Sequence, residues 1–282
     1  MNKPSPGNKP SAAAARFRTE AAKRILVTDG AWGTMIQTFG LAEADYAGTL
    51  GLSHEQKGNN DMLCLTRPDI IEKITQGYLD AGSDIVSTNT FSSTTISQAD
   101  YGAEHLVREL NLAAAGIARR AADAAQAKDG RPRFVAGALG PTNKTLSLSP
   151  DVNDPGFREV DYDQVKDVYT QQIQALLDGG VDFILIETIF DTLNAKAAIM
   201  AVLEESDRRG VEIPIMISMT ITDMSGRNLS GHAIDAFWWA VRHARPLTVG
   251  LNCSFGADLL RPHVQLLSGI ADTLLMSYPN AG

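Results

Sequence analysis

The chain has 282 residues, and 44% of them are hydrophobic, which is enough for a sizeable buried core. Its formal net charge of -8 argues against nucleic acid or an anionic membrane as the main partner. No apolar run approaches the roughly 18 residues that a membrane-spanning helix needs, and the N-terminus lacks the apolar segment of a secretory signal. Cys64 and Cys253 lie far apart in the sequence, which suits a reducing cytosol rather than a disulfide framework. These features predict a cytoplasmic protein.

The N-terminal tail differs in composition from the rest of the chain. Residues 1–12 are rich in Pro, Gly, Asn and Ser, which is typical of disorder. The segment Ala12–Lys23 could form a short leading helix. We therefore expect residues 1–20 to be a disordered or short helical tail and residues 21–282 to form a single barrel domain.

Seven short apolar runs alternate with helical stretches along this domain. The runs are Ile25–Ala31, Ile85–Phe91, Phe134–Gly140, Phe183–Thr188, Ile213–Thr220, Leu247–Cys253 and Thr273–Tyr278. Apolar strands that alternate with helices predict βαβ units and a parallel sheet covered on both faces. Eight such units in roughly 250 residues form a (β/α)8 TIM barrel. The sequence predicts an α/β fold of this kind that lacks the eighth βα unit and is incomplete at its C-terminus.

The segments between the runs carry clear helix signals and two long connections. Helices are predicted over Asp69–Ala81, Asp161–Leu177 and Met200–Arg209, each bounded by Pro, Gly or acidic residues. The connections Thr38–Thr66 and Pro141–Asp161 are long, and connections of such length are usually functional or locally folded. An incomplete barrel would also leave an open seam between its first and seventh strands. Self-association through that seam, or its occupation by another segment, is the expected remedy.

The first predicted strand ends in Asp29 and Gly30, which lead into a turn and a helix. Catalytic residues of βα barrels lie at the carboxyl ends of the strands. Glycine allows close approach of the backbone, and the N–H groups of a helix start attract a carboxylate. The turn is thus a candidate binding site for a substrate carboxylate. The alternative is a structural turn in which Asp29 caps the helix.

Two further strand ends carry candidate residues. Glu187 closes a very apolar strand, so its carboxylate is partly desolvated and calls for a cationic partner, either a substrate ammonium or a structural Lys or Arg. Cys253 ends another strand, where a thiol is either a nucleophile, a metal ligand or a small buried side chain. Cys64 has apolar neighbours and is interpreted as a core residue. The histidines show no metal-ligand spacing, and no HExxH, CxxC, Walker or GxGxxG motif occurs.

Several of these strand ends together resemble a known family from about residue 20 to the end of the chain. The pattern resembles the homocysteine-binding domain of cobalamin-dependent methionine synthase, in the homocysteine S-methyltransferase family. The matching stretches are Asp29–Met35, Gly58–Asp61, Thr88–Phe91, Gly140–Asn143, Glu187–Thr188, Asp191–Lys196 and Gly250–Cys253. The segment Ser149–Pro155 favours the cobalamin enzyme over relatives that use betaine or S-methylmethionine.

The resemblance implies that homocysteine binds zinc as a thiolate and then attacks the methyl group of methylcobalamin. Family zinc is held by three cysteines, the first of which matches Cys253. The other two form a Cys-Cys pair that this sequence does not contain. By the same resemblance, Asp29 and Glu187 would hold the substrate ammonium, backbone N–H groups near Gly30 its carboxylate, and Asn252 would orient the site.

We therefore expect a methyltransferase module that binds homocysteine for methionine formation and is inactive as an isolated chain. Its cofactors would be zinc, with cobalamin and methyltetrahydrofolate reached through the cobalamin-binding and folate-binding modules of the full enzyme. One alternative is a homocysteine S-methyltransferase with another methyl donor. Another is a non-catalytic homocysteine-binding or assembly module.

Overall fold

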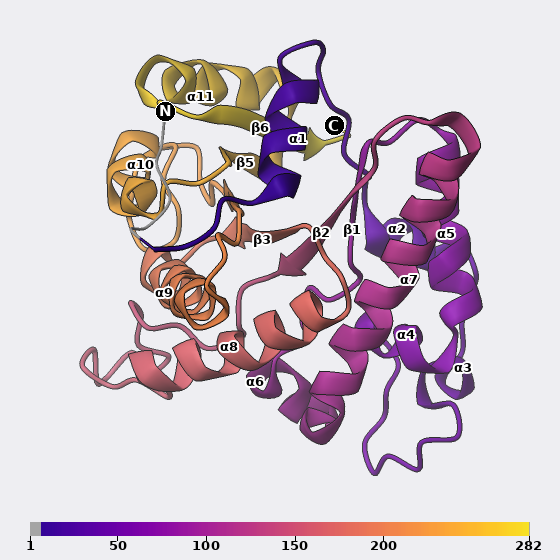
Figure 1. Cartoon of the computed structure of the whole chain (residues 1–282). Coiled ribbons are helices and arrows are strands. Elements are labelled where there is room, and N and C mark those ends of the chain that lie inside the picture. Colours follow the sequence, from indigo (N-terminus) through magenta and orange to yellow (C-terminus); the bar gives the residue numbers. More distant parts are fainter. Residues whose placement is uncertain (1–6, 282) are drawn as a thin grey trace. The chain divides into compact units, whose positions relative to one another are not determined.

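The computed structural model describes residues 7–281, which divide into two compact units. The N-terminal unit comprises Ala12–Ala138 and Gln171–Phe183, and the C-terminal unit comprises the residues up to Ser11, Leu139–Thr170 and Ile184–Gly282. In both units parallel strands alternate with helices (Figure 1). The predicted α/β class is therefore confirmed. The described residues contain six strands, so they do not establish the full count of a (β/α)8 barrel.

The N-terminal unit is mostly helical. Its helices are α1 (Ala12–Ala21), α2 (Trp32–Gln37), α3 (Glu43–Ala47), α4 (Leu63–Thr66), α5 (Pro68–Asp80), α6 (Thr95–Gln98) and α7 (Val107–Asp129). Short 3₁₀ helices cover Asn60–Met62, Ala99–Tyr101 and Glu104–Leu106. Strand β1 (Ile85–Ser87) pairs in parallel with β2 (Phe134–Leu139), and α5 and α7 pack against β1. The predicted connection Thr38–Thr66 is thus locally folded, because it contains α3 and α4.

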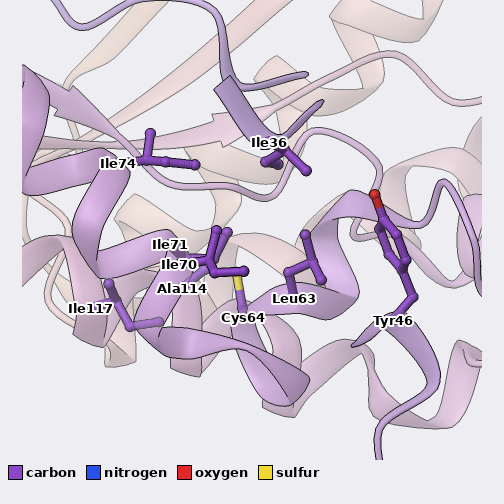
Figure 2. Close-up of a cluster of buried hydrophobic side chains, with 9 residues drawn as sticks. All are labelled: Ile36, Tyr46, Leu63, Cys64, Ile70, Ile71, Ile74, Ala114 and Ile117. Atoms are coloured by element: carbon purple, nitrogen blue, oxygen red, sulfur yellow. The ribbon is translucent and has the colours of Figure 1, made fainter. Parts of the chain in front are cut away.

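A hydrophobic cluster joins helices α2, α3, α4, α5 and α7 of this unit (Figure 2). The side chains of α5 that point inward repeat with helical spacing, as expected for one apolar helix face. The cluster comprises Ile36, Tyr46, Leu63, Cys64, Ile70, Ile71, Ile74, Ala114 and Ile117. Cys64 is 2% exposed within it, and this burial raises the pKa of its thiol. The prediction that Cys64 is a core residue is confirmed.

Helix α1 covers most of the segment Ala12–Lys23, for which the sequence suggests a short helix. Its Phe17 packs edge-on against Phe134 and Phe183, with ring centroids 5.4 Å and 5.3 Å away. Edge-to-face pairs of this kind add to the stability gained from burial alone. The helix is therefore anchored to the strands by an aromatic cluster.

The first predicted strand, Ile25–Ala31, differs from the expectation. In the described chain it is an extended segment joined to β1 by the isolated bridge between Thr28 and Ile85. The Val27 carbonyl accepts from the Ile85 N–H at 3.1 Å, and the Asp29 N–H donates to the Ile85 carbonyl at 2.9 Å. Ile25 and Val27 are 88% and 53% exposed. The apolar run therefore predicted the extended conformation correctly, but the segment is not a buried strand.

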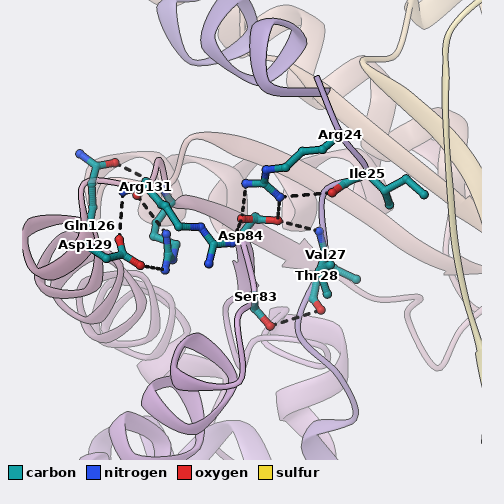
Figure 3. A network of polar contacts seen from close by, with 10 residues as sticks. Arg24, Ile25, Val27, Thr28, Ser83, Asp84, Gln126, Asp129 and Arg131 are labelled. Carbon is teal, nitrogen blue, oxygen red and sulfur yellow. Dashed lines mark hydrogen bonds and ion pairs between the residues drawn. The ribbon is translucent and has the colours of Figure 1, made fainter. Parts of the chain in front are cut away.

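A buried carboxylate fixes this segment at the start of β1 (Figure 3). Asp84 is fully buried, accepts two hydrogen bonds from Arg24 at 2.6 Å and 2.7 Å, and accepts one from Arg131 at 3.0 Å. The Val27 N–H donates to the same carboxylate at 2.9 Å. Burial acts to raise the pKa of Asp84, but the Arg24 and Val27 hydrogen bonds outweigh it and hold the pKa below its ordinary value.

The C-terminal unit holds the remaining sheet. Its elements are α8 (Tyr162–Asp178), which runs on into the N-terminal unit, β3 (Phe183–Ile189), α9 (Thr192–Arg209), β4 (Ile215–Met219), α10 (Ile234–Val241), a 3₁₀ turn (Arg242–Ala244), β5 (Thr248–Gly256), α11 (Ala257–Ile270) and β6 (Leu274–Asn280). Strands β3, β4, β5 and β6 pair in parallel and in this order. Helix α10 packs between α9 and α11, and α11 packs against β5 and β6 (Figure 1).

Strands β5 and β6 approach closely at Gly250. This residue is the register partner of Met276, and a Cβ atom at position 250 would overlap the Met276 carbonyl and side chain. Only glycine leaves room for this approach. Gly250 therefore sets where β6 lies against β5.

The predicted disorder covers residues 1–12, of which the structure describes residues 7–12. Lys9 forms a parallel bridge with Val211, and its N–H donates to the Gly210 carbonyl at 3.1 Å. The remainder of that prediction, residues 1–6, lies outside the described residues. No helix in the described part of the chain is long and apolar enough to cross a membrane.

Candidate functional site

Asn252 is the centre of a polar network at the carboxyl ends of β3, β4 and β5. Its side chain is fully buried, and its Oδ1 accepts from the Thr188 N–H at 3.1 Å and from the Ser218 hydroxyl at 2.6 Å. Its Nδ2 donates to Thr188 Oγ1 at 2.9 Å and to Cys253 Sγ at 3.0 Å. One amide thus ties three strand ends together and holds the candidate thiol.

The backbone is strained around this amide. Thr188, Cys253 and Ser254 have φ values of 56°, 55° and 60°, in the left-handed region that side chains with a Cβ rarely adopt. Thr188 is the most demanding case because its side chain is β-branched. The Ser254 hydroxyl donates to the Ile221 carbonyl, which helps to hold its conformation. Such strain persists only where surrounding contacts determine it, and it gathers at functional sites.

Glu187 lies in the same unit, beside this network. The Tyr278 hydroxyl on β6 donates to Glu187 Oε2 at 3.1 Å. Burial raises the pKa of the Tyr278 phenol well above its ordinary value. The nearby Glu187 carboxylate raises this pKa further, whereas a hydrogen bond with Ser218 lowers it. Tyr278 therefore stays neutral and can donate at neutral pH. The structure brings Glu187, Asn252 and Cys253 together.

Asp29 and Gly30 belong to the N-terminal unit. Ala31, rather than Asp29, occupies the N-cap position of α2, so the capping alternative for Asp29 is wrong. The Asp29 carboxylate accepts from the Ser87 N–H at 2.7 Å and from the Ser87 hydroxyl at 2.9 Å. Burial raises the pKa of Asp29 to about 6. A Cβ on Gly30 would come within 3.1 Å of the Tyr78 ring, which explains glycine there.

A second polar cluster surrounds Asp61 in the N-terminal unit. Its carboxylate is 4% exposed and accepts from the Ser92 N–H at 2.7 Å and from the Ser93 hydroxyl at 2.8 Å. Burial raises the pKa of Asp61 to about 6. The neighbouring Asn59 exchanges hydrogen bonds with Gln98 at 2.9 Å and 3.1 Å. These contacts give the Gly58–Asp61 motif a structural role in joining two loops.

The second long connection, Pro141–Asp161, is fixed to the start of α9. Asp191 accepts from the N–H groups of Leu146 and Ser147 at 3.1 Å and 2.8 Å, and from the Ser147 hydroxyl at 2.6 Å. It also caps α9 by accepting from the Leu193 N–H at 2.9 Å. Hydrogen bonds to Asp191 thus hold this connection in place at the carboxyl ends of the strands.

The described residues do not form a complete zinc site. No group of three or more His, Cys, Asp or Glu side chains in the described part of the chain is close enough to hold a metal ion. Tetrahedral zinc needs three or four protein ligands, whereas the network around Asn252 brings one thiol, that of Cys253. Zinc therefore does not fit the described side chains as they stand.

Sequence reasoning missed two residues of this site, Tyr278 and Ser218, and assigned no role to Thr188. Tyr278, Thr188 and Ser218 each place a hydroxyl on Glu187 or Asn252. Thr188 and Tyr278 end predicted strands, and Ser218 lies two residues before the end of one. That position was the available signal. Their hydroxyl groups gave no pattern by themselves, because Ser, Thr and Tyr are common at strand ends.

The geometry defines a parallel α/β protein with a strained polar site at its strand ends. The sequence pattern of the homocysteine S-methyltransferase family matches residues 26–282. The chain therefore belongs to the homocysteine S-methyltransferase family, and it is a methyltransferase by family.

Solved structures of the homocysteine methyltransferase MmuM from Escherichia coli share the fold. The metallated form matches with a TM-score of 0.75 and 21% sequence identity, over 94% of this chain and 87% of that chain. The oxidized form gives the same TM-score and identity over 94% and 86% of the chains. The apo form gives a TM-score of 0.69 and 20% identity over 94% and 86%.

Proposed function

We propose that this chain binds homocysteine and presents its sulfur for methylation. The observation that carries the proposal is the position of Glu187, which lies near the carboxyl end of β3, beside the network of Asn252 and Cys253. A partly buried carboxylate is a good partner for the ammonium of an amino acid. Family membership supplies homocysteine as the substrate that fits.

The proposed site residues keep the roles that the resemblance implies. In the C-terminal unit, Glu187 would hold the ammonium and Asn252 would help orient the site. Asp29 and the backbone N–H groups near Gly30 belong to the N-terminal unit, and the roles that the resemblance implies for them, on the ammonium and the carboxylate, stay predictions. Cys253 is proposed as one zinc ligand. Further ligands would have to join it, because the described residues near Asn252 bring no second thiol. In the reaction the homocysteine thiol loses its proton and its sulfur forms a bond to the methyl carbon. The bond between donor and methyl breaks, and its electron pair leaves with the donor.

The proposed methyl donor is methylcobalamin, so the proposed partners are the cobalamin-binding and folate-binding modules of a methionine synthase. The resemblance of Ser149–Pro155 supports this choice. The hydrogen bonds from Leu146 and Ser147 to Asp191 hold the neighbouring loop in place.

Self-association is a further proposed interaction. In the described C-terminal unit β6 forms the edge of the sheet, and its Leu275 is exposed. Exposed strand edges promote pairing with another chain. Light scattering over a range of protein concentrations tests this, and a mass that stays monomeric throughout would contradict it.

Calorimetry of homocysteine binding to Glu187→Gln tests the main proposal. Glutamine keeps the size of the side chain and can still accept from Tyr278, but it loses the negative charge. We expect binding to weaken by about 1.5–3 kcal/mol, the range for a hydrogen bond to a charged group. Glu204→Gln is the matched control, because Glu204 is an outer carboxylate paired with Lys166. Unchanged affinity in Glu187→Gln would remove Glu187 from the site.

A further inference from the structure

Tyr278 connects two strands that are not neighbours in the sheet. Strands β4 and β5 lie between β3, which carries Glu187, and β6, which carries Tyr278. At about 4.8 Å between strands, a flat sheet would separate β3 and β6 by roughly 14 Å. The hydrogen bond of 3.1 Å between the two side chains therefore requires that both point into the concave side of a curved sheet.

The position of Tyr278 is determined by its surroundings. It is the register partner of Asn252, so the phenol starts beside the amide that holds Thr188 and Cys253. A tyrosine side chain has only two rotatable torsions, and the backbone of β6 holds the Cα atom from which it extends. Glutamate has three, so an isolated carboxylate would sample many directions. The rigid partner of the pair is the phenol.

We propose that Tyr278 is a positioning residue that sets the specificity of the site for the amino group of its substrate. By donating to Oε2, the phenol fixes the direction of the Glu187 carboxylate towards the substrate ammonium. A carboxylate held in place by a supporting hydrogen bond binds a charged partner better than a mobile one. This inference rests on the proposed function, because it assumes that Glu187 binds the ammonium.

The test compares two ligands that differ only in the amino group. Homocysteine and 4-mercaptobutanoate share the thiol and the carboxylate, and only homocysteine carries an ammonium. Calorimetry on the 282-residue chain gives the dissociation constant of each ligand. The dissociation constant of 4-mercaptobutanoate divided by that of homocysteine measures specificity for the amino group. We expect Tyr278→Phe to weaken homocysteine binding about five- to tenfold, the equivalent of one hydrogen bond, and to leave 4-mercaptobutanoate within twofold. The ratio therefore falls.

Tyr162→Phe is the matched control. It also removes a phenol hydroxyl from the C-terminal unit, but that hydroxyl donates to the Lys196 carbonyl at 3.1 Å. It should leave the ratio unchanged. Urea unfolding of each variant establishes that the comparison is made on folded protein.

The outcomes separate the inference from the proposed function. If Glu187→Gln lowers the ratio and Tyr278→Phe does not, Glu187 binds the ammonium without help from Tyr278, and the inference is wrong. Equal weakening of both ligands by Tyr278→Phe would show a general structural role and would also overturn it. If Glu187→Gln leaves the ratio unchanged, or if the unaltered chain does not bind homocysteine, the proposed function itself fails.

Discussion

Asn252 holds Thr188 through both ends of its amide. The Oδ1 atom accepts from the Thr188 N–H at 3.1 Å, and Nδ2 donates to Thr188 Oγ1 at 2.9 Å. Threonine in the left-handed region is strained, and these two bonds supply the contacts that keep it there. The amide therefore stabilises an unfavourable backbone at the end of the strand that carries Glu187.

Replacement of this amide should destabilise the fold. In Asn252→Ala, the Thr188 N–H loses its acceptor in a half-buried position, and the Ser218 hydroxyl loses its partner. We expect the free energy of unfolding to fall by about 1–3 kcal/mol, measured by urea denaturation. Asn153→Ala, in the exposed part of the loop, should change it by less than about 0.5 kcal/mol. Equal effects of the two variants would show that the network around Asn252 does not contribute to stability.

The raised pKa of Asp61, about 6, predicts a pH dependence of stability. The folded chain keeps this proton up to about pH 6, whereas the unfolded chain releases it near pH 4. The stability that Asp61 contributes should therefore fall by up to about 3 kcal/mol as the pH rises from about 4 to about 6, and then stay constant.

Asp61→Asn tests this dependence. The amide oxygen can keep both bonds, from Ser92 and Ser93, but the side chain no longer titrates. Urea denaturation between about pH 4 and about pH 7 should show a smaller decline than in the unaltered chain, whereas Asp163→Asn on the exposed face of α8 should follow the unaltered chain. An unchanged decline in Asp61→Asn would mean that Asp61 does not titrate in this range.

The buried carboxylate of Asp84 should contribute more to the free energy of unfolding than the exposed carboxylate of Asp272, although both form short ion pairs. Asp84→Asn leaves Arg24 and Arg131 without their charged partner. We expect a loss of about 1.5–3 kcal/mol in the free energy of unfolding, the range for a hydrogen bond to a charged group. Asp272 pairs with Arg242 at 2.7 Å but is 52% exposed, so Asp272→Asn should cost less than about 1 kcal/mol. Chemical denaturation of both variants measures the difference. A larger loss for Asp272→Asn would show that burial does not make the ion pairs of Asp84 more stabilising.

Zinc binding by the 282-residue chain should be weak and should depend on Cys253. One thiol cannot provide the three or four ligands of a tetrahedral site. We expect sub-stoichiometric zinc after dialysis, a further decrease in Cys253→Ala, and no change in Cys64→Ala, whose thiol lies in the core. Metal analysis of the dialysed proteins gives the stoichiometry. One tightly held zinc per chain, retained in Cys253→Ala, would show that other residues bind the metal.

The sequence predicted well those elements that carry a local signal, such as boundary residues, an amphipathic face or a continuous apolar run. The predicted helix Asp69–Ala81 matches α5 to within one residue because Pro68 and Gly82 bound an amphipathic face. The predicted strand Phe183–Thr188 corresponds to β3 for a similar reason, its continuous apolar run. Ile25–Ala31 was wrong as a strand, because an apolar run reveals the tendency to be extended but not whether neighbours cover the side chains.

The site was only partly accessible to the same reasoning. Position at a strand end predicted Glu187, Asn252 and Cys253 as site residues. The structure bonds Cys253 to the Asn252 amide and Glu187 to Tyr278, and the binding roles of these residues stay predictions. Tyr278 could not be assigned to Glu187, because their bond depends on the curvature of a sheet whose strands are 91 residues apart along the chain at this point. Left-handed Thr188 was also unforeseen, since threonine at a strand end ordinarily indicates extended backbone.

Gly250 determines how closely β6, the strand that carries Tyr278, approaches β5, although it touches no proposed ligand group. Any side chain there would displace the Met276 carbonyl, and with it the strand that carries Tyr278 two residues later. A saturation library at position 250, selected for homocysteine binding, should therefore return glycine almost alone, and the alanine variant should lose amino-group discrimination before it loses the rest of the fold.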